Sequence, residues 1–340
     1  MFAYYCELAL RSLKRNLVLT ALMIAAVGVG IGASMTALTV LRSMSTDPIP
    51  AKSSVLYTPQ IDVWGPDSRR PDRGASGDRL PSGLTYRDAL ALLQAHRAPR
   101  QAAMYGVSQV IRPPSAKPFR TSGRATSADF FSMFDVPFER GAPWGAREDA
   151  NRANVVVLGS KLAERLFAHA DPVDKTVDLG GHDYRVVGVL RPWAPEPRFY
   201  DPDSGAFGEE ENFFIPFSTA IDRHINTNGY ENCAQAPTGG WDAHLSSSCV
   251  WIQFWAELTS SAQVRAFRSF LYDYAAEQRQ LGRFHWPPRV ELRDVTDWMV
   301  YNQVVPAAVR GIGLAADGFL VVCLINALEL MLAKFASLSR

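Results

Sequence analysis

Residues 7–34 read ELALRSLKRNLVLTALMIAAVGVGIGAS and open an uncharged run that extends from Leu17 to Leu41. A helix of about 25 residues is roughly 37 Å long, which is enough to cross the ~30 Å hydrocarbon core of a bilayer. The apolar region of a cleaved export signal has only about 7–15 residues, although Gly32-Ala33-Ser34 offers a cleavage site for that alternative. The length therefore predicts a transmembrane helix over residues 17–41.

Basic residues directly before this run define its expected orientation. Because cytoplasmic loops carry an excess of Lys and Arg, the cluster of Arg11, Lys14 and Arg15 predicts a cytoplasmic N-terminus. Residues 1–16 are interpreted as an amphipathic cytoplasmic segment, and the chain is expected to leave the membrane on the far side near Arg42.

Three alternate glycines lie inside the run, at Gly28, Gly30 and Gly32. They do not form a dinucleotide-binding fingerprint, because they are embedded in an apolar helix rather than in a turn after a strand. Small residues allow two membrane helices to approach closely, so the glycines are interpreted as a packing face for another helix. Exposure to lipid is the alternative.

A second apolar run extends from Gly311 to Ala333 and carries Asp317, Asn326 and Glu329. One charge at the middle of a membrane helix costs about 2.5–3.5 kcal/mol, so the apolar excess offsets one such charge but hardly two. Glu329 lies close enough to Lys334 to reach the membrane interface, whereas Asp317 is deeper and should face protein. A buried helix of a soluble domain is the alternative to a second membrane span.

The rest of the chain has the composition of a water-soluble protein. With 340 residues and a net charge of +1, it has ample sequence for a core and no basic excess that would favour nucleic acid as a partner. Residues 42–304 are interpreted as one extracytoplasmic domain, followed by a stalk end and second span over 305–334 and a cytoplasmic end over 335–340. Alternating strand and helix patterns predict an α+β fold.

The clearest local pattern is Thr176–Leu190, where two alternating runs flank Gly180-Gly181 and predict a β-hairpin. Thr85 and Asp88 are placed as a capping pair at the start of an amphipathic helix. Residues 191–248 are rich in loop-forming residues and are interpreted as an inserted subdomain. The remaining predictions are strands at 103–111, 119–125, 154–158, 249–258 and 290–295, and helices at 85–96, 160–167 and 261–281.

The cysteines divide between the expected compartments. Cys233 and Cys249 both fall in the extracytoplasmic region, where a disulfide closing a loop of about 15 residues is worth roughly 3 kcal/mol. The alternative is a zinc site made by His224, His244 and these two cysteines, but no C-x-x-C or H-x-x-x-H spacing supports it. We therefore expect a disulfide and no metal site.

No catalytic or cofactor-binding constellation is recognisable. A G-x-x-x-x-G-K-[ST] loop for a nucleoside triphosphate is absent from the sequence, and Glu209–Glu211 is interpreted as a solvated loop rather than a cation site. No nucleophile–base pair accompanies the isolated histidines His96, His169, His182 and His285. The tryptophans are interpreted as core or interface residues, with a surface for an apolar ligand as the alternative: Trp64, Trp144, Trp193, Trp241, Trp251, Trp255, Trp286 and Trp298.

Several segments resemble, in order, the MacB-like (FtsX-related) permease subunits of ABC transporters. They are Ala9–Asn16 (ALRSLKRN), Gly30–Ala33 (GIGA), Thr126–Gly141, Asn154–Phe167 (NVVVLGSKLAERLF), Asp171–Thr176 (DPVDKT), Leu179–Leu190 and Cys323–Ala333 (CLINALELMLA). The resemblance fades over residues 191–248. Asp135 and Asp174 stand where the family usually has Gly, and Glu329 stands where a small polar amide is common.

The resemblance implies a periplasmic core domain between the first two of four spans in a bacterial inner membrane. It implies an ABC-type ATPase as partner, with ATP bound there and no cofactor in this chain. A second permease chain, identical or different, is a further implied partner, and a periplasmic adaptor is a candidate. Residues 295–310 would be the stalk that couples ATP-driven dimerisation to the external domain for export or efflux of drugs, toxins, peptides or lipoproteins.

The chain stops at Arg340, where the family continues into a coupling segment and two further spans. A fragment, a split subunit and a degenerate copy are all compatible with that. The main alternative function is a tethered periplasmic module that binds a ligand or scaffolds a complex without an ATPase. A membrane-bound hydrolase is a third hypothesis, for which no catalytic constellation speaks.

Overall fold

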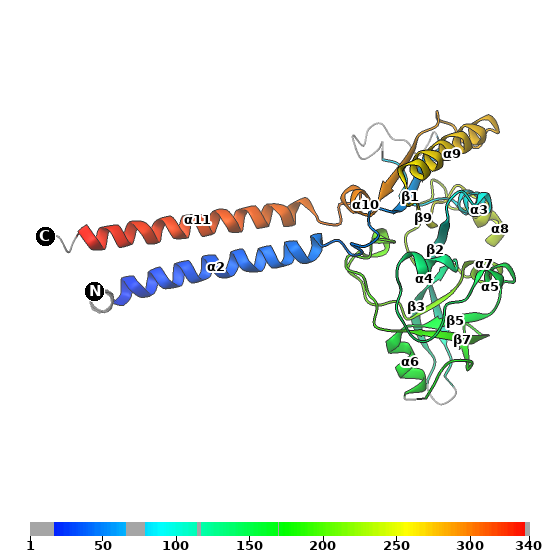
Figure 1. Ribbon diagram of the computed structural model, residues 1–340, viewed down its shortest axis with the longest axis horizontal. Helices are drawn as coiled ribbons and strands as arrows, with labels where there is room; N and C mark the ends of the chain where they lie inside the picture. The colour runs from blue at the N-terminus through cyan, green and yellow to red at the C-terminus, as the bar shows by residue number, and fades with distance from the viewer. Residues whose placement is uncertain (1–16, 66–78, 114–116, 169, 337–340) are drawn as a thin grey trace. The chain divides into compact units, whose positions relative to one another are not determined.

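The structure is a computed structural model that describes residues 17–65, 79–113, 117–168 and 170–336 (Figure 1). The chain divides into two compact units, one made by residues 1–46 and 303–340 and the other by residues 47–302. Arg11, Lys14 and Arg15 lie outside the described residues, as does His169.

The first unit contains two long helices, α2 (Leu17–Ser45) and α11 (Ala307–Ala336). Among the described residues, Thr20–Arg42 of α2 is the one segment long and apolar enough to cross a membrane by length and composition. The corresponding apolar stretch of α11 is shorter, at Leu314–Asn326. The second predicted span therefore stays a prediction.

The second unit is built on a mixed sheet, which has ten strands within the described residues in the order β10-β1-β9-β2-β3-β8-β5-β7-β4. β6 is off this path and pairs with β2 and β7. Two neighbouring pairs are parallel, β3 with β8 and β5 with β7. The strands are β1 (Leu56–Ile61), β2 (Arg100–Ile111), β3 (Phe119–Thr126), β4 (Phe138–Gly141), β5 (Val155–Leu158), β6 (Thr176–Leu179), β7 (His182–Leu190), β8 (Phe213–Pro216), β9 (Gln253–Glu257) and β10 (Val290–Asp294).

Helices lie between the strands along the chain, which confirms the predicted α+β class. The longest is α9 (Ser261–Gln280), whose capping Ser260 accepts from the backbone of Gln263. The others are α3 (Tyr86–Ala95), α4 (Asp129–Met133), α5 (Ala146–Ala150), α6 (Ser160–Phe167), α7 (Phe217–Asp222), α8 (Trp241–Ser246) and α10 (Val295–Tyr301), with a 3₁₀ turn at Pro202–Ser204.

The hairpin predicted over Thr176–Leu190 is present as β6 and β7, with Leu179 paired to His182. Gly180 and Gly181 adopt φ angles of +65° and +89°. A two-residue turn of this kind needs positive φ at both positions, which glycine adopts without steric cost. The local sequence was therefore sufficient to predict this element.

Alternate residues of β2 face two separate hydrophobic cores. Ala103, Tyr105 and Val107 belong to one core, whereas Ala102 and Met104 belong to the other. Successive side chains of a strand point to opposite faces, so a sheet that is covered on both sides produces this division. The predicted core role is confirmed for four tryptophans, which are 0–3 % exposed: Trp144, Trp251, Trp255 and Trp298.

The interpretation of residues 191–248 as an inserted subdomain was wrong, because β8 lies inside the main sheet between β3 and β5. The segment is also fixed by a buried ion cluster. Arg124 of β3 donates from Nη2 to Asp201 at 2.8 Å and from Nε to Glu211 at 2.8 Å. A strand of only four residues, FFIP, gives too short a pattern to distinguish from a loop.

Candidate functional site

The helix pair brings small and polar residues of α2 and α11 together. Gly30 and Ser34 are the buried residues of the contact on α2, and Cys323 is buried on α11. A Cβ atom at Gly30 would lie 3.1 Å from Cys323 Sγ, so the absence of a side chain permits the close approach. Ser34 contacts Asp317, which precedes Cys323, so the two helices run antiparallel.

Ser34 Oγ donates a hydrogen bond of 2.8 Å to Asp317 Oδ1. Asp317 was expected to face protein, and this bond supplies a partner within the chain. Asp317 is nevertheless exposed, as are Asn326 and Glu329, the other polar residues of the run. Hydrogen bonds between membrane helices typically contribute about 0.6 kcal/mol each, so the pair adds specificity of register to a contact made mainly by close packing.

The expected packing face of three glycines needs correction. Gly30 meets α11, but Gly28 and Gly32 are exposed and have no heavy atom within 4 Å. Residues two apart on an α-helix are separated by about 200° around its axis. Gly30 therefore points away from the face that Gly28 and Gly32 share. The small residues that share the contact face are Gly30 and Ser34, four positions apart.

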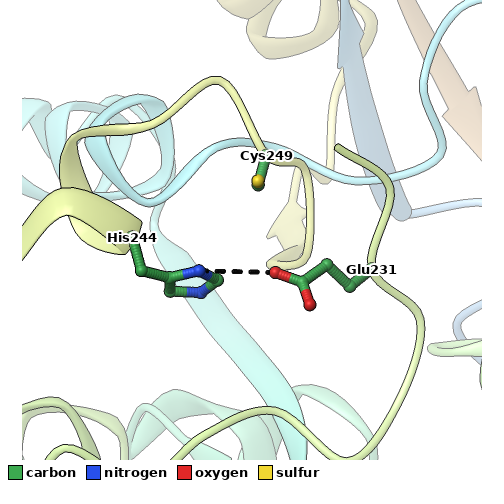
Figure 2. Close-up of side chains that lie close together, drawn as sticks. All are labelled: Glu231, His244 and Cys249. Atoms are coloured by element: carbon green, nitrogen blue, oxygen red, sulfur yellow. Dashed lines mark ion pairs between the residues drawn. The ribbon is translucent and has the colours of Figure 1, made fainter. Parts of the chain in front are cut away.

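The predicted disulfide between Cys233 and Cys249 is present. Figure 2 shows Cys249 together with Glu231 and His244, whose Nδ1 lies 3.4 Å from Glu231 Oε1. One ligand atom from each of the three residues lies within 4.8 Å of the others. A disulfide sulfur is not a thiolate, however, and zinc requires the thiolate form. His224 stacks on Trp241 at 5.6 Å between ring centroids. With the disulfide formed, the four residues of the alternative zinc site do not make a metal centre.

A groove of about 770 Å³ lies between α3, α5 and α7, and its volume is that of a pocket for a drug-sized molecule. Apolar and aromatic side chains make much of its wall, among them Tyr86, Leu90, Leu93, Phe217 and Ile221. Asp129, Asp149 and Asp222 add carboxylates, of which Asp222 pairs with Arg152 at 2.6 Å.

Asp149 is a half-buried carboxylate of this groove with a shifted pKa. Burial raises the pKa of Asp149 to about 6, although hydrogen bonds from the Ala128 amide and from Trp144 Nε1 lower it. No pattern in the sequence indicated the groove, because its residues come from several helices, a strand and a loop and follow no linear spacing.

The sequence profile of the MacB-like periplasmic core domain matches residues 20–269. A relative named macrolide export ATP-binding/permease protein MacB, from Azoarcus sp. strain BH72, is 25 % identical over 214 residues, or 62 % of this chain and 30 % of the relative. The protein of the same name from Escherichia coli K12 is 29 % identical over 241 residues, covering 69 % and 34 %. The chain thus spans about a third of the length of these curated relatives.

Among solved structures, the periplasmic region of MacB from Actinobacillus actinomycetemcomitans is similar, at 15 % identity, with 76 % of this chain and 96 % of that chain covered and a TM-score of 0.46. The extracellular domain of the ABC-type transporter YknZ from Gram-positive bacteria is 13 % identical, with 69 % and 99 % covered and a TM-score of 0.42. Because the family profile covers most of the chain, the protein belongs to the family of the MacB-like periplasmic core domain.

Proposed function

We propose that the chain is a membrane-anchored permease subunit that couples a cytoplasmic ATPase to movements of a periplasmic domain for export or efflux. ATP would be bound by a partner subunit, and a second permease chain would complete the complex, with a periplasmic adaptor as a further candidate. The N-terminus would lie in the cytoplasm of a bacterium, the core domain in the periplasm, and α11 would return through the inner membrane.

One observation carries this proposal beyond family membership. The core domain over residues 47–302 is bracketed by two helices that pack antiparallel through Gly30, Ser34 and Asp317. An ionisable residue is expensive in the hydrocarbon core and needs a partner or a water-filled surrounding. A helix pair that gives Asp317 a hydrogen-bond partner within the chain supports a two-helix attachment, as a transmitting subunit requires.

The route of transmission follows from chain connectivity. β10 runs into α10 at Asp294, whose side chain accepts a hydrogen bond from the backbone of Asp297, and α10 precedes α11. Residues 295–310 therefore connect the sheet to α11 and are our candidate for the stalk. A displacement of α11 along its axis would be delivered to the β1–β10 side of the sheet.

The test is a mild-detergent purification of the tagged full chain from its native host, with ATPase assay and identification of bound proteins. We expect a P-loop ATPase to co-purify with the wild type and with Asn326→Leu, a control on the same helix. Asp317→Leu should insert normally but recover less ATPase, because Ser34 loses its acceptor.

Recovery of the intact chain without any ATPase, under conditions that hold a related transporter together, would overturn the proposal. The groove between α3, α5 and α7 would then favour the second candidate function, a tethered module that binds a ligand. Equal ATPase recovery with Asp317→Leu would leave the transporter assignment intact and remove the role of Asp317.

A further inference from the structure

A second cavity, of about 310 Å³, lies in the core domain away from the groove described above. The β6–β7 turn, neighbouring positions of β2 and β3, and the loop after α7 provide its walls. Its charged and titratable lining residues are Arg120, His182, Arg223 and His224, and no Asp or Glu is among its described lining residues. The lining therefore carries two fixed positive charges and no negative charge.

The two arginines of this cavity lack counter-ions. In the described chain, neither guanidinium forms an ion pair or a hydrogen bond. Asp222, next to Arg223 in the chain, is already engaged, since it pairs with Arg152 at 2.6 Å, and the side chains of Arg120 and Arg223 are exposed. The positive charge of Arg120 and Arg223 is thus left for a group from outside the chain.

The loop that lines the cavity is held in place before any ligand arrives. The Asn228 amide donates to the Gly106 carbonyl at 2.7 Å, and Tyr105 Oη donates to the Ile225 carbonyl at 3.0 Å. On the opposite wall, Gly180 of the β6–β7 turn lies close to the side chain of Gln109. A pre-ordered wall lowers the entropic cost of binding.

One further polar group in the cavity wall is unsatisfied. Thr227 Oγ1 is buried and has no hydrogen-bond partner among the described residues. A buried hydroxyl without a partner costs free energy, so Thr227 is a strained point of this wall although its oxygen does not face the cavity. The two arginines are the groups that point to a ligand class, because guanidinium groups bind phosphate and carboxylate oxygens in a bidentate manner.

We propose that this cavity is a binding site for an oxyanion, a phosphate or carboxylate group, held by Arg120 and Arg223. The volume is near the lower end for ligand pockets, so the ligand presents a small anionic group rather than a large body. The inference does not depend on the proposed transport function.

The test uses the full chain in a non-ionic detergent at low ionic strength, titrated calorimetrically with inorganic phosphate and with citrate. A separate experiment compares co-sedimentation of the chain with phosphatidylglycerol vesicles and with phosphatidylcholine vesicles. It uses the same detergent, diluted below its critical micelle concentration. The variant is Arg120→Gln/Arg223→Gln. The matched control is Arg87→Gln/Arg279→Gln, which removes the same charge from two exposed residues outside the cavity.

We expect saturable binding that weakens about 10-fold or more in the cavity variant and is unchanged in the control, because each charge-assisted hydrogen bond contributes strongly to affinity. Binding of the free ions identifies a soluble anion as the source. Binding only to the anionic vesicles, with the same loss in the cavity variant, identifies a lipid headgroup. No saturable binding in either arm, or equal weakening by the control, would overturn the site.

Discussion

Arg124 shows how one residue joins distant parts of this chain. Its guanidinium is 1 % exposed and lies between Asp201 and Glu211, with Tyr200 Oη donating to Glu211 at 3.2 Å. Burial lowers the pKa of Arg124, but the carboxylates of Glu211 and Asp201 outweigh that effect and raise the pKa above its ordinary value. The cluster thus holds the segment after Arg191 against β3. Removal of one of its charges would leave the others buried without a partner.

Arg124→Met should strongly destabilise the core domain, because it leaves two carboxylates buried without their cation. We expect a loss of about 3–5 kcal/mol in the free energy of unfolding. Urea unfolding followed by tryptophan fluorescence measures it, with Arg120→Met as the control on the same strand, where we expect less than about 0.5 kcal/mol. Similar midpoints for the two variants would contradict the structural role of the cluster.

Asp149 predicts a pH dependence of stability. Its pKa is raised by burial from the ordinary value of 3.8 to about 6 in the folded chain, so between these values the folded state holds a proton that the unfolded state has released. The contribution of Asp149 to stability therefore falls as the pH rises from about 4 to about 6, by roughly 2 kcal/mol. Above that window the penalty of the buried charge is complete.

Asp149→Asn removes this titration. The free energy of unfolding of the wild type minus that of the variant should decrease by about 2 kcal/mol between about pH 4 and about pH 7. This change is expected even if the two proteins differ in stability at every pH. Chemical unfolding at a series of pH values measures the difference. A difference that does not change with pH would show that Asp149 keeps its ordinary titration in the folded protein.

Two further residues explain a departure from the family pattern. Asp135 and Asp174, which stand where the family usually has Gly, have φ angles of +49° and +62°. Asp is among the few residues other than Gly that adopt this left-handed region at modest cost. Their carboxylates pair with Lys52 at 2.7 Å and with Arg185 at 3.0 Å. Both positions thus adopt a backbone conformation that glycine favours, with a side chain that forms an ion pair.

At the scale of elements, the contact between α2 and α11 depends on which glycine faces the partner helix. Gly30→Leu places a large side chain against Cys323, whereas Gly28→Leu adds the same side chain to an exposed face. We expect the first variant to weaken helix packing by about 1 kcal/mol and the second to leave it unchanged.

The measurement is oxidative cross-linking of Ser34→Cys with Asp317→Cys, in a background with Cys6→Ser and Cys323→Ser, since the two native side chains lie in hydrogen-bond contact. Cross-linking should fall about fivefold with Gly30→Leu, which corresponds to about 1 kcal/mol. Equal yields in the Gly30 and Gly28 variants would contradict the assignment of the contact face.

For the whole molecule, the proposed topology predicts opposite outcomes for two fusions. Green fluorescent protein fused after Arg340 should fluoresce, because that end would be cytoplasmic, and alkaline phosphatase fused after Asn302 should be active in the periplasm. Fluorescence and phosphatase assays in intact cells measure both. An active phosphatase after Arg340 would show that α11 does not return to the cytoplasm.

The sequence predicted those parts of the fold that local chemistry determines. The Gly180-Gly181 turn requires positive φ, and the pairing of Cys233 with Cys249 followed from a shared compartment and a short loop. Features made by distant residues could not be predicted, such as the ion pair of Arg124 with residues 77 and 87 positions away. The groove between α3, α5 and α7 could not be predicted either, because no spacing along the chain marks its residues.

The place where the core domain joins its two flanking segments has a mechanical consequence. The chain reaches β1 at Leu56 and leaves β10 at Asp294, and these strands pair antiparallel with Tyr57 opposite Asp294. Both connections are therefore attached to the same end of one strand pair. A force that pulls the two connections apart would break the hydrogen bonds between β1 and β10 one after another, starting at this end. A force that moves both connections in the same direction would move the sheet as a rigid body.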